Sequence, residues 1–267
     1  MTAGVSTASH PPTALVTGGA SGIGLATAHA LGGTGTIVYV GGRGEAQGLL
    51  AVETLHRAGI DGRYIKLDVR DSASVATAIA LIADSFGTLD ILVNNAGVEC
   101  VGVVDELDES QWDDCFDTNL KGAFLCSRAA IPLMRSGGGG VIINNASNAG
   151  LLARANEPAY SAAKAGLVML TRSMALAYAA DRIRVNAVCP GPVGGTGIMD
   201  RNISSAADPA AAAAGYIARA PLAAAYGRMI EPAEVAALIA YLCSEAATMI
   251  TGAIIPIDGG KSAGPAA

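Results

Sequence analysis

Aromatic residues, charged residues and long apolar runs are all scarce in this chain of 267 residues. Aromatic residues make up 4% of it and charged residues 15%, and 17 basic against 23 acidic side chains give a formal charge of −6. An acidic chain with few rings lacks the basic face and the stacking platforms that bind nucleic acids. No apolar run approaches the ~18 residues that cross a bilayer, and residues 1–13 lack the features of a signal peptide. We therefore expect a cytoplasmic protein with no nucleic-acid and no membrane partner.

Cysteine occurs five times without a recognisable pattern. The number is odd, the residues are scattered, and no CxxC pair occurs. This distribution favours neither a zinc site nor a disulfide framework. We expect reduced thiols that pack as small apolar side chains, and we predict no metal site.

Apolar residues and glycine are abundant instead. Hydrophobic residues make up 51% of the chain, which excludes intrinsic disorder. The 34 glycines exceed the usual share of ~7%, and they follow no three-residue period, so the chain is not collagen-like. They cluster at a few turns, which indicates places where the backbone approaches another group closely.

Short apolar runs alternate with helical stretches along the chain. The runs at 14–17, 36–40, 64–67, 91–93, 141–143, 184–188 and 253–257 are mostly continuous, as in strands buried on both faces. Helices are predicted at 22–31, 46–58, 72–86, 121–134, 158–180 and 232–243. This alternation predicts an α/β fold with a parallel sheet and helices on both faces. The alanine-rich stretch 206–225 could be a linker, but it contains two prolines and is expected to form short helices over a site.

No composition break divides the chain, so we predict one domain over residues 1–267. Residues 12–191 would form its core, residues 192–228 a separate segment beside the core, and residues 229–260 the C-terminal helix and the last strand.

A glycine-rich turn joins the first predicted strand to the first predicted helix. It reads Gly18-Gly19-Ala20-Ser21-Gly22-Ile23-Gly24. Glycines here would let the backbone approach a pyrophosphate, and the helix N-terminus would offer N–H donors and the positive end of its dipole. The spacing GxxxGxG differs from the GxGxxG dinucleotide fingerprint, so this turn alone is a weak signal.

Three further groups of residues point to the same edge of the sheet. The sequence NNAG at 94–97 follows the fourth predicted strand, and Ser147 follows the fifth. Tyr160 and Lys164 lie four residues apart in a predicted helix, so the phenol and the ammonium share one face. Ligands of parallel sheets bind at the carboxyl ends of the strands, where all of these residues are expected.

Together these motifs resemble the short-chain dehydrogenase/reductase family over nearly the whole chain. The resemblance rests on TGGASGIG at 17–24, Asp68-Val69, NNAG at 94–97, Asn119, Ser147, Tyr160-xxx-Lys164, Pro190-Gly191 and ITGAIIPIDGG at 250–260. It implies a doubly wound, Rossmann-type domain with a seven-stranded parallel sheet. It also implies that NAD or NADP binds and that a hydride passes between the nicotinamide and a carbonyl or secondary-alcohol substrate.

The resemblance assigns catalytic roles to four residues. Tyr160 would be the general acid/base, and Lys164 would lower its pKa from the ordinary value of about 10 and hold the nicotinamide ribose. Ser147 would fix the substrate oxygen. Asn119 would break its helix locally and hold a water that relays protons to Lys164.

The same resemblance gives a set of cofactor contacts. They are Gly18, Ser21, Gly22, Ile23, Gly24, Arg43, Asp68, Val69, Asn95, Ala96, Gly97, Tyr160, Lys164, Pro190, Gly191 and Val193. NAD-dependent relatives carry an acidic residue at the end of the second strand, and Gly42 stands there. Arg43 follows it and could pair with a 2′-phosphate, so NADP is preferred and NAD remains possible. Ser21 stands where many NADP-dependent relatives carry a second basic residue, which weakens this preference.

The substrate is the least determined feature. Ser147, Tyr160, Glu99 and Asn148 are predicted to contact it, and Cys100, Leu152, Glu157 and residues 192–226 are expected to line its pocket. A small neutral ketone, hydroxylated compound or sugar alcohol is favoured. Relatives that act on carrier-protein substrates carry arginines on the central helices, where this chain has Leu176 and Pro132.

Two other functions stay open at this point. One is a 3-oxoacyl thioester reductase of the same family, and the other is a catalytically silent nucleotide sensor. The resemblance also implies a homotetramer, although Ala177 stands where relatives often have a glutamate that contributes to the interface.

Overall fold

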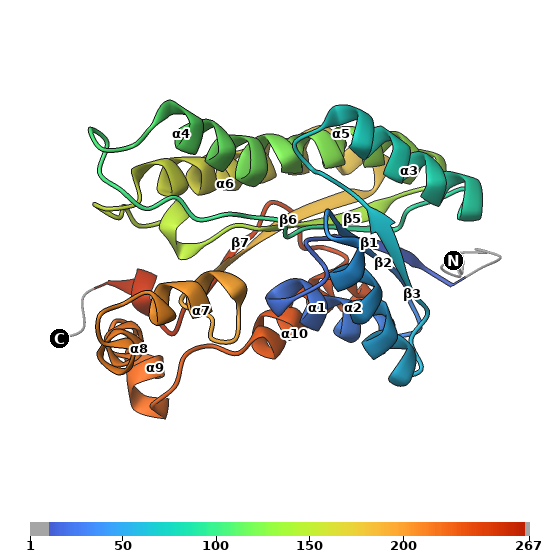
Figure 1. The fold of residues 1–267 in the computed structure, drawn as a ribbon. Coiled ribbons are helices and arrows are strands. Elements are labelled where there is room, and N and C mark those ends of the chain that lie inside the picture. Colours follow the sequence, from blue (N-terminus) through green and yellow to red (C-terminus); the bar gives the residue numbers. More distant parts are fainter. Residues whose placement is uncertain (1–10, 265–267) are drawn as a thin grey trace.

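Seven strands form one parallel sheet in the order β3-β2-β1-β4-β5-β6-β7 (Figure 1). The computed structural model describes residues 11–264; residues 1–10, most of the segment searched above for a signal peptide, and residues 265–267 lie outside this part. The strands are β1 (Thr13–Thr17), β2 (Ile37–Gly42), β3 (Gly62–Lys66), β4 (Ile91–Asn94), β5 (Gly140–Asn145), β6 (Ile183–Pro190) and β7 (Ile254–Ile257). The predicted α/β class and the seven-stranded parallel sheet are confirmed.

Helices cover both faces of this sheet, as Figure 1 shows. One layer holds α1 (Gly22–Gly32), α2 (Glu45–Arg57) and α10 (Pro232–Cys243). The other holds α3 (Ser72–Phe86), α4 (Glu109–Phe116), α5 (Gly122–Ser136) and α6 (Pro158–Tyr178). Three further helices, α7 (Gly197–Ser204), α8 (Pro209–Ala218) and α9 (Pro221–Tyr226), gather beside α10 and form a separate group.

The strands in the middle of the sheet are mostly apolar because both faces of the sheet are covered. All five residues of β1 are buried, with Leu15 in the hydrophobic cluster of one face and Val16 in that of the other. In β5, Ile142 likewise belongs to the hydrophobic cluster of one face and Ile143 to that of the other. Successive side chains of a strand point to opposite faces, so a strand covered on both sides needs continuous rather than alternating apolar residues.

The structure contains two helices that the sequence did not indicate, α4 and α7. Each buries a single side chain, Cys115 in α4 and Met199 in α7, so neither shows the apolar stripe that predicts a helix. The stretch 206–225 forms two short helices, as expected, and not a linker. Pro209 begins α8 and Pro221 begins α9, because the first helical position needs no N–H donor.

No helix among residues 11–264 is long and apolar enough to cross a membrane. The same residues hold no group of three or more His, Cys, Asp or Glu side chains that could bind a metal ion.

A ladder of buried polar side chains ties β4 and β5 to the helices above them. The Asn94 amide donates to Asn144 Oδ1 at 2.8 Å and to Ser127 Oγ of α5 at 3.1 Å. The Asn144 amide in turn donates to Thr171 Oγ1 of α6 at 2.8 Å. Asn144 is fully buried, so each of these groups depends on the next for its hydrogen bond.

We expect Asn144→Ala to lower the free energy of unfolding by about 1–3 kcal/mol, because it removes one hydrogen-bond partner from each of the buried side chains of Asn94 and Thr171. Urea denaturation measures this loss. Ser85→Ala, which removes an exposed hydroxyl of α3, is the control and should change stability by less than about 0.5 kcal/mol. Equal stabilities of the two variants would show that the ladder contributes nothing.

Candidate active site

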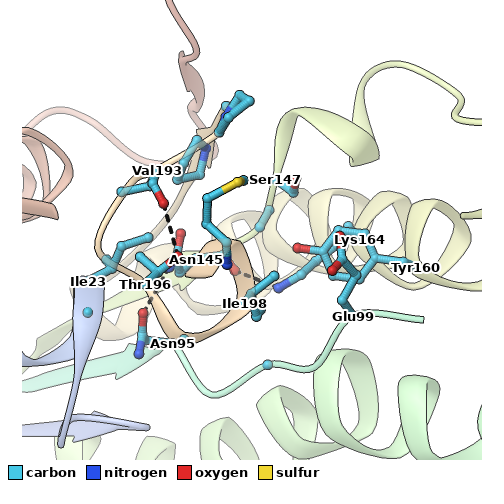
Figure 2. Close-up of a pocket in the computed structure, with 18 of the residues that line it drawn as sticks. Ile23, Asn95, Glu99, Asn145, Ser147, Tyr160, Lys164, Val193, Thr196 and Ile198 are labelled. Carbon is cyan, nitrogen blue, oxygen red and sulfur yellow. Dashed lines mark hydrogen bonds between the residues drawn. The ribbon is translucent and has the colours of Figure 1, made fainter. Parts of the chain in front are cut away.

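A cavity of about 670 Å³ opens at the carboxyl ends of the strands. The glycine turn after β1 and the segment after β4 line one side, and residues after β5 and β6 line another. In Figure 2, Ile23 and Asn95 lie on one side of this space, and Tyr160, Lys164 and Glu99 lie together on the other. The parallel arrangement of the strands brings together segments that are more than 200 residues apart in the chain, from Gly18 to Lys261.

The glycine turn is packed so closely that side chains would not fit. A Cβ on Gly24 would stand 2.2 Å from Gly18 O and 2.6 Å from the Asn95 amide nitrogen. Gly18 and Gly22 have positive φ angles of 61° and 51°, which favour glycine. Helix α1 begins directly after this turn, and Ser21 at its N-cap makes no side-chain cap, so the first N–H groups of α1 are available to an anion.

Asn95 and Thr17 join the turn to the end of β4. The Asn95 amide donates to Thr17 O at 3.0 Å and to Gly18 O at 3.2 Å. The Thr17 hydroxyl accepts from the backbone N–H groups of Asn95 and Ala96, both at 3.0 Å. These bonds fix the two loops on either side of the point where the sheet reverses its strand order, which is where open parallel sheets bind ligands.

Ser147, Tyr160 and Lys164 meet at the inner end of the cavity. Ser147 ends the loop after β5, and Tyr160 and Lys164 project from the first turns of α6, which begins with Pro158. The Lys164 ammonium lies 5.6 Å from the centre of the Tyr160 ring and donates to Asn145 O at 2.9 Å. The predicted meeting of these three residues is therefore present in the structure.

Burial controls the pKa values of this group. It raises the pKa of Tyr160 to about 12, against the lowering effects of a hydrogen bond with Ser147 and of the nearby Arg154 charge. Burial also lowers the pKa of Lys164 to about 8. Desolvation outweighs the neighbouring charges here, and the cation that lowers the pKa of Tyr160 is Arg154. The effect of Lys164 on the pKa of Tyr160 stays a prediction.

Asn119 lies in the helix break that the sequence predicted. Residues Asp117–Lys121 form a π-helical turn between α4 and α5. The Asn119 amide donates to Cys115 O and Val98 O, both at 2.8 Å, and its carbonyl oxygen accepts from Val98 N–H at 3.2 Å. A Cβ placed on Gly97 would lie 2.9 Å from Asn119 Oδ1 and 3.6 Å from Lys164 Nζ, so both side chains reach the same small space.

The residues predicted to contact adenosine lie at the ends of β2 and β3, outside the lining of the cavity. Arg43 is exposed, and a Cβ on Gly42 would meet nothing within 4 Å. The Asp68 carboxylate binds the Arg70 guanidinium at 2.8 Å, which lowers the pKa of Asp68 more than the charge of Arg43 does. Val69 is buried, and its side chain packs against Gly122, where an added Cβ would collide with it. These positions leave room beside Arg43 for a ribose and its substituents.

Apart from Arg43, Asp68 and Val69, all of the predicted cofactor contacts line the cavity. They are Gly18, Ser21, Gly22, Ile23, Gly24, Asn95, Ala96, Gly97, Tyr160, Lys164, Pro190, Gly191 and Val193. Thr196, left uncertain by its shifted spacing, also lines it. Its hydroxyl donates to Val193 O at 2.9 Å and accepts from Met199 N–H, and so begins helix α7.

The substrate side differs from the prediction at several positions. Glu99 and Glu157 line the cavity as expected. Asn148 does not: it is buried behind the wall, where its carbonyl oxygen accepts from the Arg154 guanidinium at 2.6 Å. Cys100 and Leu152 are likewise absent from the lining. Burial raises the pKa of Glu99, whose carboxylate accepts from the Asn202 amide at 2.7 Å.

Four cationic residues line this side, namely Arg154, Arg201, Arg219 and Lys261. Arg201 and Arg219 lie within the predicted lining segment 192–226 but were not singled out, and sequence reasoning missed Arg154 and Lys261. The rule that ligands bind at the carboxyl ends of parallel strands applies to β7 as well, and it would have indicated Lys261. Arg219 has no such signal, because its position depends on how α8 folds back over the cavity.

Comparisons with known proteins agree with this geometry. The family model for short chain dehydrogenases matches residues 12–207. The chain belongs to the short-chain dehydrogenase/reductase family. It is 42% identical to the cis-4-hydroxycyclohexanecarboxylate dehydrogenase of Sinomonas cyclohexanicum over 94% of this chain and 96% of that protein.

Two further similarities extend this result. The chain is 41% identical to a ketoacyl reductase assigned to the monensin polyketide synthase of Streptomyces virginiae, over 92% of this chain and 95% of that protein. Among solved structures, a variant of actinorhodin polyketide ketoreductase with NADPH superimposes with a TM-score of 0.90 at 34% identity, covering 97% of this chain and 99% of that one. This short-chain dehydrogenase/reductase is therefore an oxidoreductase that acts on alcohols and ketones.

The residues present fit the nicotinamide cofactor that the family implies. The glycine turn forms a cradle in the cavity lining through Gly18, Gly22 and Gly24, next to the free N–H groups of α1. Such a cradle suits the pyrophosphate of a dinucleotide. Lys164 and the open space beside Arg43 lie at the two ends where riboses would be held.

The low pKa of Lys164 generates a prediction about stability. Below a pH of about 8 the buried ammonium is charged at a cost, so the cofactor-free enzyme should gain stability as the pH rises from 8 toward 10.5. At pH 7 we expect Lys164→Met to raise the free energy of unfolding by about 1–3 kcal/mol, since the pKa is lowered by about two units at roughly 1.4 kcal/mol each. The difference in the free energy of unfolding between Lys164→Met and the wild type should be smaller at pH 10 than at pH 7.

Urea denaturation of the cofactor-free protein at pH 7, 8, 9 and 10 measures this effect. Lys121→Met removes an exposed ammonium that pairs with Asp117, and it should show no such trend with pH. A Lys164→Met variant that is less stable than wild type at pH 7 would contradict the prediction.

Proposed function

We propose that this enzyme catalyses NADP(H)-linked interconversion of a secondary alcohol and a carbonyl compound, with Tyr160 as the general acid/base. The observation that carries the proposal is the convergence of Ser147, Tyr160 and Lys164 on one cavity with the glycine turn. The sequence also left open a catalytically silent nucleotide sensor. This alternative is not supported, because the relatives that are similar over nearly their whole length are named as dehydrogenases and reductases.

The chain's own residues would move the proton. A bound nicotinamide would supply or accept the hydride at the substrate carbon. During carbonyl reduction, the Tyr160 hydroxyl donates its proton to the substrate oxygen as that oxygen gains negative charge, and Ser147 fixes the oxygen by a hydrogen bond. With a pKa of about 12, Tyr160 is protonated at neutral pH and ready for this direction.

Lys164 and Asn119 would complete the site. The Lys164 ammonium is anchored on Asn145 O at 2.9 Å, and it would hold ribose hydroxyls and stabilise the tyrosinate that forms. Asn119 reaches the same space beside Gly97, and we propose that it holds the water through which Tyr160 regains its proton by way of Lys164.

We propose NADP rather than NAD as the preferred cofactor. Gly42 presents no side chain to repel a 2′-phosphate, and the exposed Arg43 follows it. Asp68, an acidic group close enough to feel the charge of Arg43, is paired with Arg70 at 2.8 Å. Since Ser21 supplies no second cation, the preference should be modest.

Two of the similarities favour a second candidate, a 3-oxoacyl thioester reductase, because the relatives concerned are named as ketoacyl or polyketide reductases. The surface argues against a carrier-protein substrate. Leu176, one of the positions where an acidic carrier would need a cation, is 84% exposed and apolar. We therefore rank this candidate below reduction of a free carbonyl compound.

We also propose that the enzyme is a homotetramer. Helices α5 and α6 leave large apolar side chains in contact with solvent, with Phe124 at 44%, Met169 at 56% and Leu176 at 84% exposure. Such side chains on neighbouring helices suit burial against a second copy.

The first test of the mechanism is Tyr160→Phe. The variant keeps the ring and removes the only hydroxyl proposed to protonate the substrate, so kcat should fall by at least about a hundredfold. NADPH affinity, measured by quenching or transfer of its fluorescence, should change little. Tyr241→Phe on the exposed face of α10 is the control. A Tyr160→Phe variant that keeps a tenth or more of wild-type turnover would refute the role.

The second test concerns the cofactor. The wild type should prefer NADPH over NADH by about tenfold in kcat/KM, which corresponds to one charge-assisted bond at the low end of its range. The double variant Gly42→Asp/Arg43→Ala should reverse this order, because the open space at Gly42 admits a carboxylate that repels a 2′-phosphate. A wild type that prefers NADH would mean that Arg43 does not face the cofactor.

A further inference from the structure

Three cationic side chains from distant parts of the chain converge beside Tyr160. Arg154 comes from the segment before α6, Arg219 from the end of α8, and Lys261 from the turn after β7, and all three line the cavity. Arg154 and Arg219 are close enough to Lys261 for their charges, together with burial, to lower its pKa. The Arg154 charge also acts on Tyr160. The cations therefore surround the substrate end of the cavity.

The acidic groups nearby neutralise only part of this cluster, although the charges of Glu157 and Asp258 also act on Lys261. Glu157 is engaged by Arg154 at 2.6 Å. The buried Asp258 accepts from the N–H groups of Gly260 and Ser262, and so it holds the turn that presents Lys261. Glu99 also lines the cavity, but burial raises its pKa, which disfavours its charged form.

Arg219 and Lys261 have no anionic partner within residues 11–264. The Arg219 guanidinium lies 5.2 Å from the centre of the Tyr216 ring, and neither side chain makes an ion pair or a side-chain hydrogen bond. Like charges that are held together in a partly desolvated cavity repel one another. This cluster is cationic although the chain as a whole, with 17 basic residues, carries a net charge of −6. A cationic cluster of this kind is stabilised when an anion binds.

The anionic parts of the cofactor have another place to bind. The cradle for a pyrophosphate lies at the N-terminus of α1, and the open space for a 2′-phosphate lies beside Arg43 after β2. Arg154, Arg219 and Lys261 lie instead on the side of Tyr160. The anion that they bind is therefore part of the substrate.

We infer that the substrate carries a carboxylate, which Arg219 and Lys261 bind with support from Arg154 while its carbonyl or hydroxyl carbon faces Tyr160. This inference rests on the proposed function and narrows its substrate class to hydroxy and oxo acids. It replaces the small neutral substrate that the sequence favoured, because the cationic side chains of the cavity outnumber its acidic ones. Arginine and lysine both form strong charge-assisted hydrogen bonds with a carboxylate.

The first experiment compares 4-oxocyclohexanecarboxylate with its methyl ester, which share one ketone and differ in charge. With NADPH, the wild type should show at least tenfold higher kcat/KM for the acid. In Arg219→Gln and in Lys261→Gln this acid-to-ester ratio should fall about tenfold, and Arg219→Lys should recover part of it. Arg57→Gln, which removes an exposed charge on α2, is the matched control and should leave the ratio unchanged.

Equal kcat/KM values for acid and ester in the wild type would overturn the inference, and so would a ratio that Arg219→Gln/Lys261→Gln does not change. NADPH affinity of the same double variant should stay within about threefold of wild type. A larger loss of affinity would assign the cations to the cofactor and would also overturn the inference.

A second experiment separates this inference from the proposed chemistry. Calorimetry of the enzyme with NADP should show that cyclohexanecarboxylate binds at least tenfold more tightly than cyclohexanecarboxamide, and that the double variant loses the difference. If this preference holds while neither ketone is reduced, the proposed reaction fails and carboxylate binding stands. If both ketones are reduced and the preference is absent, the reaction stands and carboxylate binding fails.

Discussion

The site depends on the contact between the loop after β1 and the loop after β4. Four hydrogen bonds cross this contact. The Thr17 hydroxyl accepts from the backbone N–H groups of Asn95 and Ala96, and the Asn95 amide donates to Thr17 O and Gly18 O. Gly18 and Gly24 allow the backbones to come this close, since any Cβ at Gly24 would collide with Gly18 O. Without this contact, the N-terminus of α1 would not face the cavity, and the cofactor cradle would lose its shape.

Burial gives the catalytic residues their properties at a cost to stability. The same desolvation that raises the pKa of Tyr160 to about 12 lowers that of Lys164 to about 8. The neighbouring carboxamide ladder of Asn94 and Asn144 shows the opposite arrangement, in which buried polar groups satisfy one another. The amides of Asn94 and Asn144 thus bind one another, whereas Tyr160 and Lys164 line the cavity.

Charge is distributed in two different ways in this protein. The chain as a whole is acidic, with a formal charge of −6, whereas five of its 17 basic side chains line one cavity. Net charge describes the surface that other macromolecules meet, and it argues against nucleic-acid partners. The local charge of the cavity describes what the site binds. The two properties are independent, because a few side chains from distant segments are enough to set the second.

The sequence determined the sheet, most helices and the meeting of Ser147, Tyr160 and Lys164 at one cavity. Buried strands require continuous apolar runs, and all seven predicted strands agree with the structure to within about two residues at each end. Tyr160 and Lys164 lie one helical turn apart, so their meeting follows from local geometry. Only the tertiary structure decided that Asn148 lies behind the cavity wall, that Arg154 is the cation acting on Tyr160, and that Arg219 and Lys261 meet. These contacts join residues from separate elements. Periodicity along the chain predicts the elements themselves, but it does not predict which side chains of separate elements will meet.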